Sequence, residues 1–218
     1  MKTWLLVAFG AAFALLAGTA WAEDVDVEDI IKADLTKNAD VAADLIKNLC
    51  TSCHGKEGRS ENPTVPHLAG QQEEYMVAQI KAFRKRTRGD PHAQAYMWGA
   101  ARTPGLTEGV IEAISGYYAK RKPAPGTPSD NKDLLEKGKA LYLHGAADKQ
   151  IPKCAKCHGD KAEGDELIPR LAGQHKEYLT KQIEAVQMTT RENPALHELL
   201  GHLTADDIDA LTAYLASQ

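Results

Sequence analysis

The sequence is poor in cysteine, with only four among its 218 residues. All four lie in two Cys-x-x-Cys-His motifs, residues 50–54 and 154–158, so none remains to build a disulfide framework. No segment alternates apolar and polar residues with a period of two, which argues against a fold of half-buried strands. The net charge of -4 argues against a nucleic-acid-binding protein.

Long apolar runs are scarce as well. The run over residues 5–17 is shorter than the roughly 20 residues that a membrane span needs. Lys2 precedes it and Ala20-Trp21-Ala22 follows it, which is the pattern of a secretory signal peptide. We expect cleavage near Glu23, a periplasmic location and no transmembrane segment in the mature chain; an uncleaved anchor is the alternative.

The two cysteine motifs predict covalent haem. Two cysteines two residues apart, followed at once by histidine, are the attachment signature of a c-type haem. One helical turn sets the two sulfurs at the separation of the porphyrin vinyl groups, and the neutral imidazole can bind iron. A structural zinc site or a thioredoxin-type pair would not explain a histidine after both pairs. The residues are Cys50, Cys53 and His54 in the first motif and Cys154, Cys157 and His158 in the second.

Segments outside the motifs repeat in the same order. Residues 66–71 recur as residues 169–174, both with the pattern Pro-x-Leu-Ala-Gly-Gln, and the closing segment 107–119 recurs as 204–216. A proline-rich segment lies between the halves and cannot continue a helix. The predicted divisions are a signal peptide 1–22, a first domain 23–122, a linker 123–130 and a second domain 131–218.

Within each half the periodicity is helical, so we expect an all-α fold. Thr107 and Thr204 are predicted to cap the closing helices. The other predicted helices are residues 40–49 and 72–85 in the first half and residues 134–144 and 175–187 in the second.

These features resemble the dihaem cytochromes c of the cytochrome c4 family over residues 40–218. The resemblance implies two tandem class I cytochrome c domains, each wrapped round a covalent haem. It implies that the Pro66 carbonyl accepts a hydrogen bond from His54, and that Pro169 does the same for the second histidine. His67 stands where the family has arginine. The residues that the resemblance places near the haem propionates are Gln71, Gln174, Tyr75, Tyr178 and Arg170.

The sixth iron ligand distinguishes the two halves. Met97 stands in the interval where the family has its methionine, and its thioether would favour ferrous iron; the alternative is that it fills core space beside Trp98. In the second half the family position is Leu196, and His197 follows in a predicted loop bounded by Pro194 and Gly201. We expect His197 to bind the second iron. The alternatives are Met188, His202 and an open iron.

Basic side chains gather at the end of the predicted helix 72–85. They are either a solvated face or a docking patch for an acidic redox partner. The residues are Lys81, Arg84, Lys85, Arg86 and Arg88.

Two function classes follow. The first is an electron carrier that exchanges single electrons with redox protein partners, such as a periplasmic carrier and a membrane-bound terminal oxidase. The second is a dihaem enzyme, or the haem subunit of a sulfur-compound dehydrogenase or peroxidase. The second class needs an open iron, and only the absence of methionine at Leu196 points to it.

Overall fold

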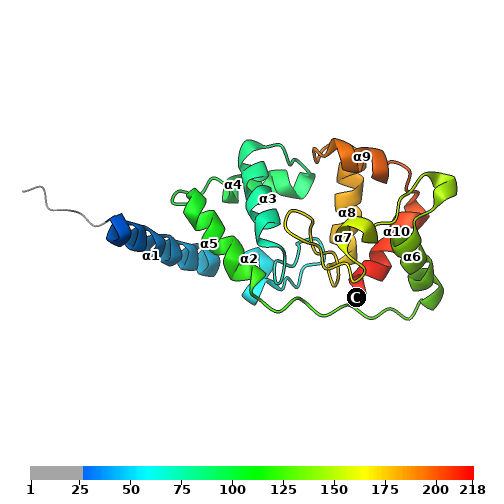
Figure 1. The fold of residues 1–218 in the computed structure, drawn as a ribbon, viewed down its shortest axis with the longest axis horizontal. Helices are drawn as coiled ribbons and strands as arrows, with labels where there is room; N and C mark the ends of the chain where they lie inside the picture. Colours follow the sequence, from blue (N-terminus) through cyan, green and yellow to red (C-terminus); the bar gives the residue numbers. More distant parts are fainter. Residues whose placement is uncertain (1–26) are drawn as a thin grey trace, which may run out of the picture.

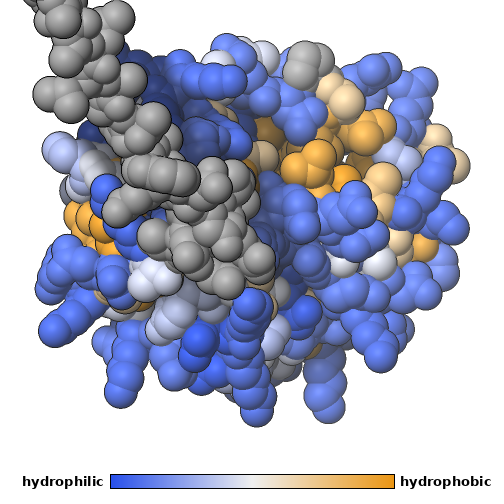
Figure 2. All heavy atoms as spheres, turned by 60° about the vertical axis from the view of Figure 1, so that its left-hand side comes forward, coloured by the Kyte–Doolittle hydropathy of each residue, from blue (hydrophilic) through white to orange (hydrophobic). Residues whose placement is uncertain are grey.

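A computed structural model describes residues 27–218 (Figure 1). In this range the regular structure is helical, with three isolated β-bridges and no strand. None of the helices described there is long and apolar enough to cross a membrane. Where the described residues are visible in Figure 2, most side chains are hydrophilic, with an apolar area at the upper right and a smaller one at the left. The predicted signal peptide lies outside the described residues.

The helices divide between the two halves of the chain. The first half contains α1 (Val27–Leu45), α2 (Thr51–His54), α3 (Glu73–Lys85), α4 (Trp98–Ala100) and α5 (Glu108–Ala119), with π-helical turns at Ile46–Cys50 and Ala93–Met97. The second half contains α6 (Lys132–His144), α7 (Ala155–His158), α8 (Lys176–Gln187), α9 (Pro194–Leu200) and α10 (Ala205–Ala216). Short 3-10 turns lie at Lys56–Gly58 and Ala147–Lys149.

The helix before the first motif is longer than predicted. It was expected over residues 40–49, but α1 begins at Val27 and runs through the π-helical turn into the motif. No glycine or proline interrupts this part of the sequence, so nothing in the backbone ends the helix earlier. Ala42 and Ile46 are buried, whereas Leu35 is 64% exposed. The C-terminal part of the helix therefore packs on the domain.

The segment predicted as a loop around Pro194 and Gly201 is a helix, so that prediction is wrong. Pro194 stands at the start of α9, where a missing backbone N–H costs nothing. The side chain of Asn193 caps this end and accepts a hydrogen bond from the Leu196 N–H at 3.1 Å. Gly201 follows as the C-cap.

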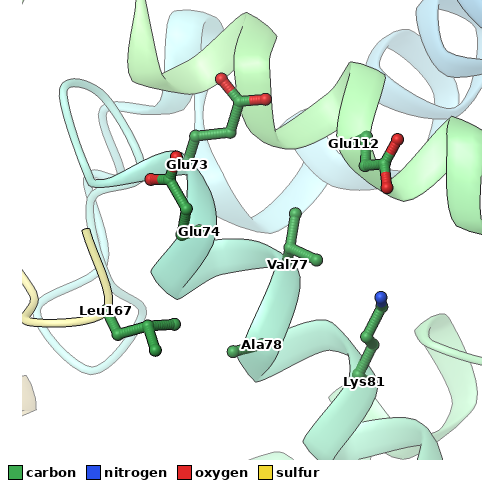
Figure 3. A pocket seen from close by; sticks show the side chains of 7 residues that line it. All are labelled: Glu73, Glu74, Val77, Ala78, Lys81, Glu112 and Leu167. Carbon is green, nitrogen blue, oxygen red and sulfur yellow. The ribbon is translucent and has the colours of Figure 1, made fainter.

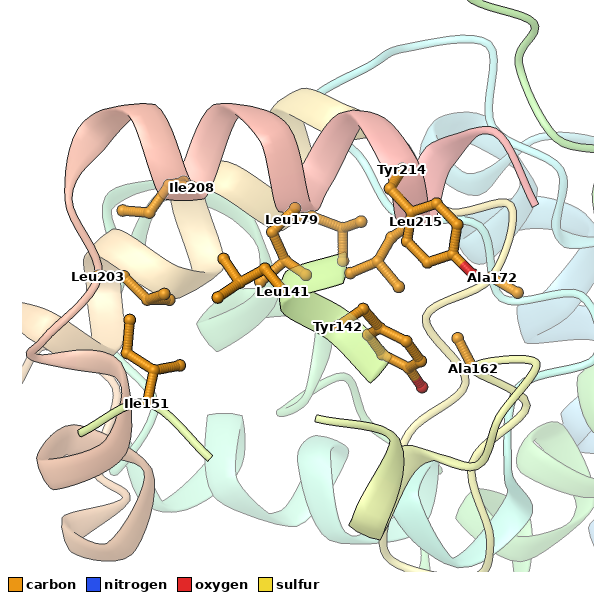
Figure 4. Packing of buried hydrophobic residues seen from close by; sticks show 11 residues of the cluster. Leu141, Tyr142, Ile151, Ala162, Ala172, Leu179, Leu203, Ile208, Tyr214 and Leu215 are labelled. Carbon is orange, nitrogen blue, oxygen red and sulfur yellow. The ribbon is translucent and has the colours of Figure 1, made fainter. Parts of the chain in front are cut away.

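Each half has its own hydrophobic core. In the first half the core lies where α1, α3 and α5 meet, and Ile46, Met76 and Tyr118 are among its buried members. In the second half α6, α8 and α10 surround Leu141, Leu179 and other apolar residues (Figure 4). Thr107 and Thr204 cap the closing helices α5 and α10 as predicted. These findings confirm the all-α fold.

Equivalent backbone hydrogen bonds connect the repeated segment to the closing helix in both halves. The Gly70 N–H donates to the Tyr118 carbonyl at 2.9 Å, and the Gly173 N–H donates to the Leu215 carbonyl at 2.9 Å. Both glycines follow the Leu-Ala pair of the repeated segment and have positive φ. A segment without helix joins the halves, and its Thr127 N–H donates to the Ala216 carbonyl in α10.

Candidate haem-binding sites

The two cysteine motifs form matching short helices. Residues Thr51–His54 form α2 and Ala155–His158 form α7, and a glycine with positive φ ends each of them. At Gly55 a Cβ atom would lie 2.0 Å from the carbonyl oxygen of Arg59, so only glycine fits this turn. The chain can therefore turn back sharply after each histidine towards the Pro-x-Leu-Ala-Gly-Gln segment.

Each motif histidine contacts the proline carbonyl that the resemblance assigned to it. The Nδ1 atom of His54 lies 3.0 Å from the Pro66 carbonyl oxygen, and Nδ1 of His158 lies 3.0 Å from that of Pro169. A carbonyl oxygen only accepts, so Nδ1 carries the proton and Nε2 keeps the lone pair that a metal needs. Burial lowers the pKa of both histidines, although the proline carbonyls act in the opposite direction. Both imidazoles therefore favour the neutral form.

The cysteines suit thioether attachment better than metal binding. Cys53 and Cys157 are exposed, while the other two are partly buried. Burial raises the pKa of the Cys154 thiol to about 11, which disfavours the thiolate that a zinc site or a redox-active pair requires. Over residues 27–218 no three His, Cys, Asp or Glu side chains form a cluster suited to a metal ion.

Two buried nitrogens beside the proline carbonyls lack a hydrogen-bond partner among the described residues. They are Nδ1 of His67 and Nε of Arg170, the residues that directly follow Pro66 and Pro169. Leaving a buried polar group unpaired costs about 1–3 kcal/mol. A haem propionate is an anionic acceptor that would satisfy either nitrogen, so these residues fit the group.

Met97 lies at the end of a π-helical turn over the C-terminal half of α3. It packs with Trp98 against the buried side chains of Phe83, Ala93 and Ala101. Met76 is instead part of the core between α1, α3 and α5. Met97 is therefore the methionine of the first domain outside that main core.

Equivalent side chains at the ends of α3 and α8 bond the backbone that follows the candidate ligand in each domain. Arg84 donates from Nε to the Ala101 carbonyl at 3.1 Å, and Gln187 donates from Nε2 to the Leu200 carbonyl at 2.8 Å. Met97 precedes Ala101 by four residues, as Leu196 precedes Leu200. Counted from these carbonyls, Leu196 corresponds to Met97. The same two side chains also bond the Leu106 and Leu203 carbonyls, which Met97 and Leu196 precede by nine and seven residues, so the correspondence stays a prediction.

His197 is the exposed neighbour of Leu196 on α9. Its Nδ1 atom lies 2.9 Å from the Val186 carbonyl oxygen near the end of α8, so Nδ1 carries the proton and Nε2 has a free lone pair. Met188 caps α8 and is 66% exposed, and His202 is exposed beyond α9. Among these candidates His197 is the one adjacent in sequence to Leu196, and the ligand of the second iron stays a prediction.

Two glutamines form reciprocal hydrogen bonds between the domains, which sequence reasoning missed. The Gln71 side chain bonds both the N–H and the carbonyl of Arg170, at 2.7 and 3.0 Å. The Gln174 side chain bonds the N–H and the carbonyl of His67, at 2.9 and 3.0 Å. Each domain therefore holds the segment that follows the proline of the other domain.

A buried arginine–tyrosine network forms a second set of contacts between the domains. Arg88 donates to the Tyr178 hydroxyl at 2.9 Å, and Arg191 donates to the Tyr75 hydroxyl at 2.7 Å. Both arginines also donate to Gln79 and Gln182. The resemblance implies that these tyrosines lie near the propionates. In the structure their hydroxyls accept hydrogen bonds from arginines of the other domain. The network consists of Tyr75, Gln79, Arg88, Tyr178, Gln182 and Arg191.

The arginines of this network lie on adjacent backbone segments. Arg88 and Arg191 form an isolated antiparallel bridge, and the Gly89 N–H donates to the Thr190 carbonyl at 2.8 Å. Burial acts to lower the pKa of Arg88, but the oxygens of the two tyrosines and of Asp90 raise it above its ordinary value. The buried guanidinium thus stays charged.

The basic cluster predicted at the end of α3 is mostly engaged within the protein. Arg88 belongs to the buried network and Arg86 lies over the Trp98 ring, 5.0 Å from its centroid. Lys81 and Arg84 pair with Glu108. These contacts weaken the prediction of a docking patch.

A shallow hollow outside the motifs lies along α3 and α5 (Figure 3). Leu167 of the second domain reaches it and is 61% exposed. The hollow contains no cysteine or histidine, so it is separate from the haem sites. Its lining residues are Glu73, Glu74, Val77, Ala78, Lys81, Glu112 and Leu167.

Comparison with known proteins identifies one family and several similar electron-transfer proteins. The family model of cytochrome c matches twice, at residues 39–120 and 135–218. The chain is 35% identical to cytochrome c-552 of Acidithiobacillus ferridurans, over 77% of this chain and 73% of that protein. It is 30% identical to cytochrome c4 of Thiocapsa roseopersicina, over 77% of this chain and 85% of that protein. It is 33% identical to the thiosulfate dehydrogenase electron acceptor of Thiomonas intermedia (strain K12), over 78% of each.

Solved structures agree with the sequence relatives. The cytochrome c4 structure from Acidithiobacillus ferrooxidans superposes with a TM-score of 0.72 at 34% identity, over 78% of this chain and 98% of that one. Two cytochrome c domains, each with a Cys-x-x-Cys-His motif, account for two covalent haem c groups. The chain therefore belongs to the cytochrome c family, as a dihaem electron-transfer protein of the cytochrome c4 group.

Proposed function

We propose that the protein is a periplasmic carrier of single electrons with two unlike haems. The observation that supports this most directly is the repeated site, in which each motif histidine is oriented by a proline carbonyl at 3.0 Å. The reciprocal glutamine contacts hold the two sites against each other, which suits transfer between them. Such a carrier does not make or break covalent bonds in a substrate.

The donor we propose is an enzyme that oxidises a sulfur oxoanion such as thiosulfate. This proposal is supported by the relative named as an electron acceptor of thiosulfate dehydrogenase. The acceptor would be another redox protein, such as a terminal oxidase. In this role the protein takes electrons from the enzyme rather than acting on thiosulfate itself.

In the first domain His54 and Met97 would be the axial ligands, and in the second His158 and His197. The free Nε2 lone pair of His197 and its place beside Leu196 support the second assignment. An α-helix turns by about 100° per residue, so α9 must rotate by about that angle to bring residue 197 to the position of residue 196. The nitrogen ligand would give the second haem the lower potential, and electrons would then run from it to the Met97 haem.

One set of spectra tests the carrier proposal. The purified holoprotein should take up two electrons, remain low-spin when oxidised and bind no carbon monoxide when reduced. A high-spin signal with carbon monoxide binding would instead indicate an open iron and favour the enzyme. Thiosulfate alone should leave the oxidised protein unchanged, while thiosulfate with thiosulfate dehydrogenase should reduce it.

Magnetic spectroscopy of the ferric protein tests the ligands. We expect one histidine–methionine signal and one bis-histidine signal, and His197→Ala should remove only the second. Two histidine–methionine signals in the unmodified protein would refute His197 and favour Met188.

A further inference from the structure

His67 and Arg170 occupy the same place in the two repeats but differ in their ability to lose a proton. Each directly follows the proline whose carbonyl orients a motif histidine. Each also has a buried side-chain nitrogen that no described residue satisfies. Arginine keeps its charge at every accessible pH, whereas histidine titrates between about pH 5 and 8 when unperturbed.

The missing partner is best supplied by the cofactor. Apart from its iron, haem c presents two propionate carboxylates, which are acceptors that match both nitrogens. A protonated His67 would donate from Nδ1 to a carboxylate, and Arg170 would donate from Nε. Neutral His67 could also donate from Nδ1 in one of its tautomers, but it would carry no charge to balance the carboxylate, so the imidazolium binds the carboxylate more strongly.

The His67 ring is held in place from the second domain. Gln174 bonds both backbone groups of His67, and the His175 ring lies 3.9 Å away between centroids. Nε2 of His175 lies 3.0 Å from the Ser60 carbonyl oxygen, so that nitrogen acts as a donor. The backbone of His67 is therefore fixed by the second domain, and the His175 ring packs against its side chain.

The titratable groups that face His67 are His175 and Arg59. Together with burial, which has the largest effect, they lower the pKa of His67 to about 4. A neighbouring carboxylate acts in the opposite direction and favours the imidazolium. The charge state of His67 therefore depends on the charge of the haem beside it.

We propose that His67 binds a proton when the first haem is reduced, whereas the second haem, beside Arg170, gains its electron without one. As the redox partner delivers one electron and ferric iron becomes ferrous, one proton from solvent adds to the unprotonated ring nitrogen of His67, which becomes an imidazolium. Oxidation reverses both steps. This inference rests on the proposed carrier function and adds proton coupling at one of its two sites.

The direction of the pH effect follows from charge. Reduction adds one negative charge near His67, so the pKa of His67 is higher in the reduced than in the oxidised state. Between these two pKa values the reduction equilibrium of the first haem weakens by up to about tenfold per pH unit as pH rises. The second haem shows no such dependence from Arg170.

The test is a redox titration of the full holoprotein at pH values from 4 to 8. Two one-electron steps are expected, which checks the carrier function separately. The midpoint potential of one step should depend on pH, and that of the other step should not. His67→Arg should abolish the dependence, and Arg170→His should create one at the second haem, with the first domain left unaltered.

Two results would overturn the inference. One is a finding that neither midpoint potential depends on pH in the unmodified protein. The other is a pH dependence that persists in His67→Arg. In His67→Gln, which keeps a neutral polar side chain, the midpoint potential of the first haem should also be independent of pH. It should equal the value that the unmodified protein has at high pH. Failure to show two one-electron steps would instead count against the carrier function itself.

Discussion

At the scale of single residues, the sixth-ligand prediction for the second haem rests on Leu196, the residue that we expect in the place of Met97. Leu196→Met would place a thioether at this position. We expect the sulfur-to-iron charge-transfer absorption of the oxidised protein to grow and the potential of the second haem to rise, because neutral sulfur favours ferrous iron. Absorption spectra and redox titration measure both. Leu199→Met, at a side chain 41% exposed, is the matched control.

Met97→Ala should act in the opposite way on the first haem. The charge-transfer band should disappear and one potential should fall, while the other haem stays nearly unchanged. Met188→Ala is the control, because Met188 is 66% exposed. A band that persists in Met97→Ala would show that Met97 serves only to pack against Phe83 and Ala101.

Residue identity and spacing were enough to predict the local parts of the site. The haem motifs, the proline segments and the threonine caps each depend on neighbours within about one helical turn or one short loop. The partner of Tyr75 could not be predicted in this way, because Arg191 lies 116 residues away in the sequence. The sequence predicts surface charge at Arg88, whereas the structure buries it, because the sequence does not show which basic side chains a second domain covers.

At the scale of elements, α6 and α10 cross at a point that only glycine permits. A Cβ atom on Gly138 would lie 2.0 Å from the Ala210 carbonyl oxygen, so Gly138→Ala must push the helices apart. We expect a loss of about 1–3 kcal/mol in the free energy of unfolding, measured by denaturant titration of the holoprotein. Gly99→Ala, where no atom lies within 4 Å of the new Cβ, should cost far less.

The start of α10 should make the protein sensitive to acid. Asp207 forms a capping box with Thr204 and accepts from Lys149 at 2.7 Å. Burial opposes the charged form of this carboxyl, but these partners lower its pKa to about 2. A lowered pKa contributes stability above the unfolded value of about 3.9, and the contribution is lost as pH falls towards 2.

Asp207→Asn should therefore lower the free energy of unfolding by about 2 kcal/mol at neutral pH and by less as pH falls to 2. Unfolding curves across that range measure the difference from the unmodified protein. Asp209→Asn is the control, because that side chain is 52% exposed and pairs with Lys176 at the surface. An equal loss at every pH would contradict the assignment.

At the scale of the whole molecule, function depends on keeping two separately folded domains in one orientation. Each domain has its own core, and the contacts that join the domains include the polar contacts of the glutamines and of the arginine–tyrosine network. Polar contacts of this kind are directional, and a buried donor that loses its acceptor is costly. The interface therefore favours one register between the haem sites over a range of loosely packed ones.

Tyr178→Phe removes one acceptor from the buried guanidinium of Arg88 without changing the shape of the ring. We expect the domains to separate more often, at a cost of about 1–3 kcal/mol, because Arg88 keeps its charge but loses a partner. Hydrogen exchange should report this at the Gly89 amide, whose N–H donates across the interface to Thr190 at 2.8 Å. Amides within α3 and α8 should keep their protection, and Tyr96→Phe, at a side chain 67% exposed, should change neither set. Unaltered exchange at Gly89 in Tyr178→Phe would mean that the other contacts between the domains, such as those of the glutamines, keep the interface closed without the Tyr178 hydroxyl.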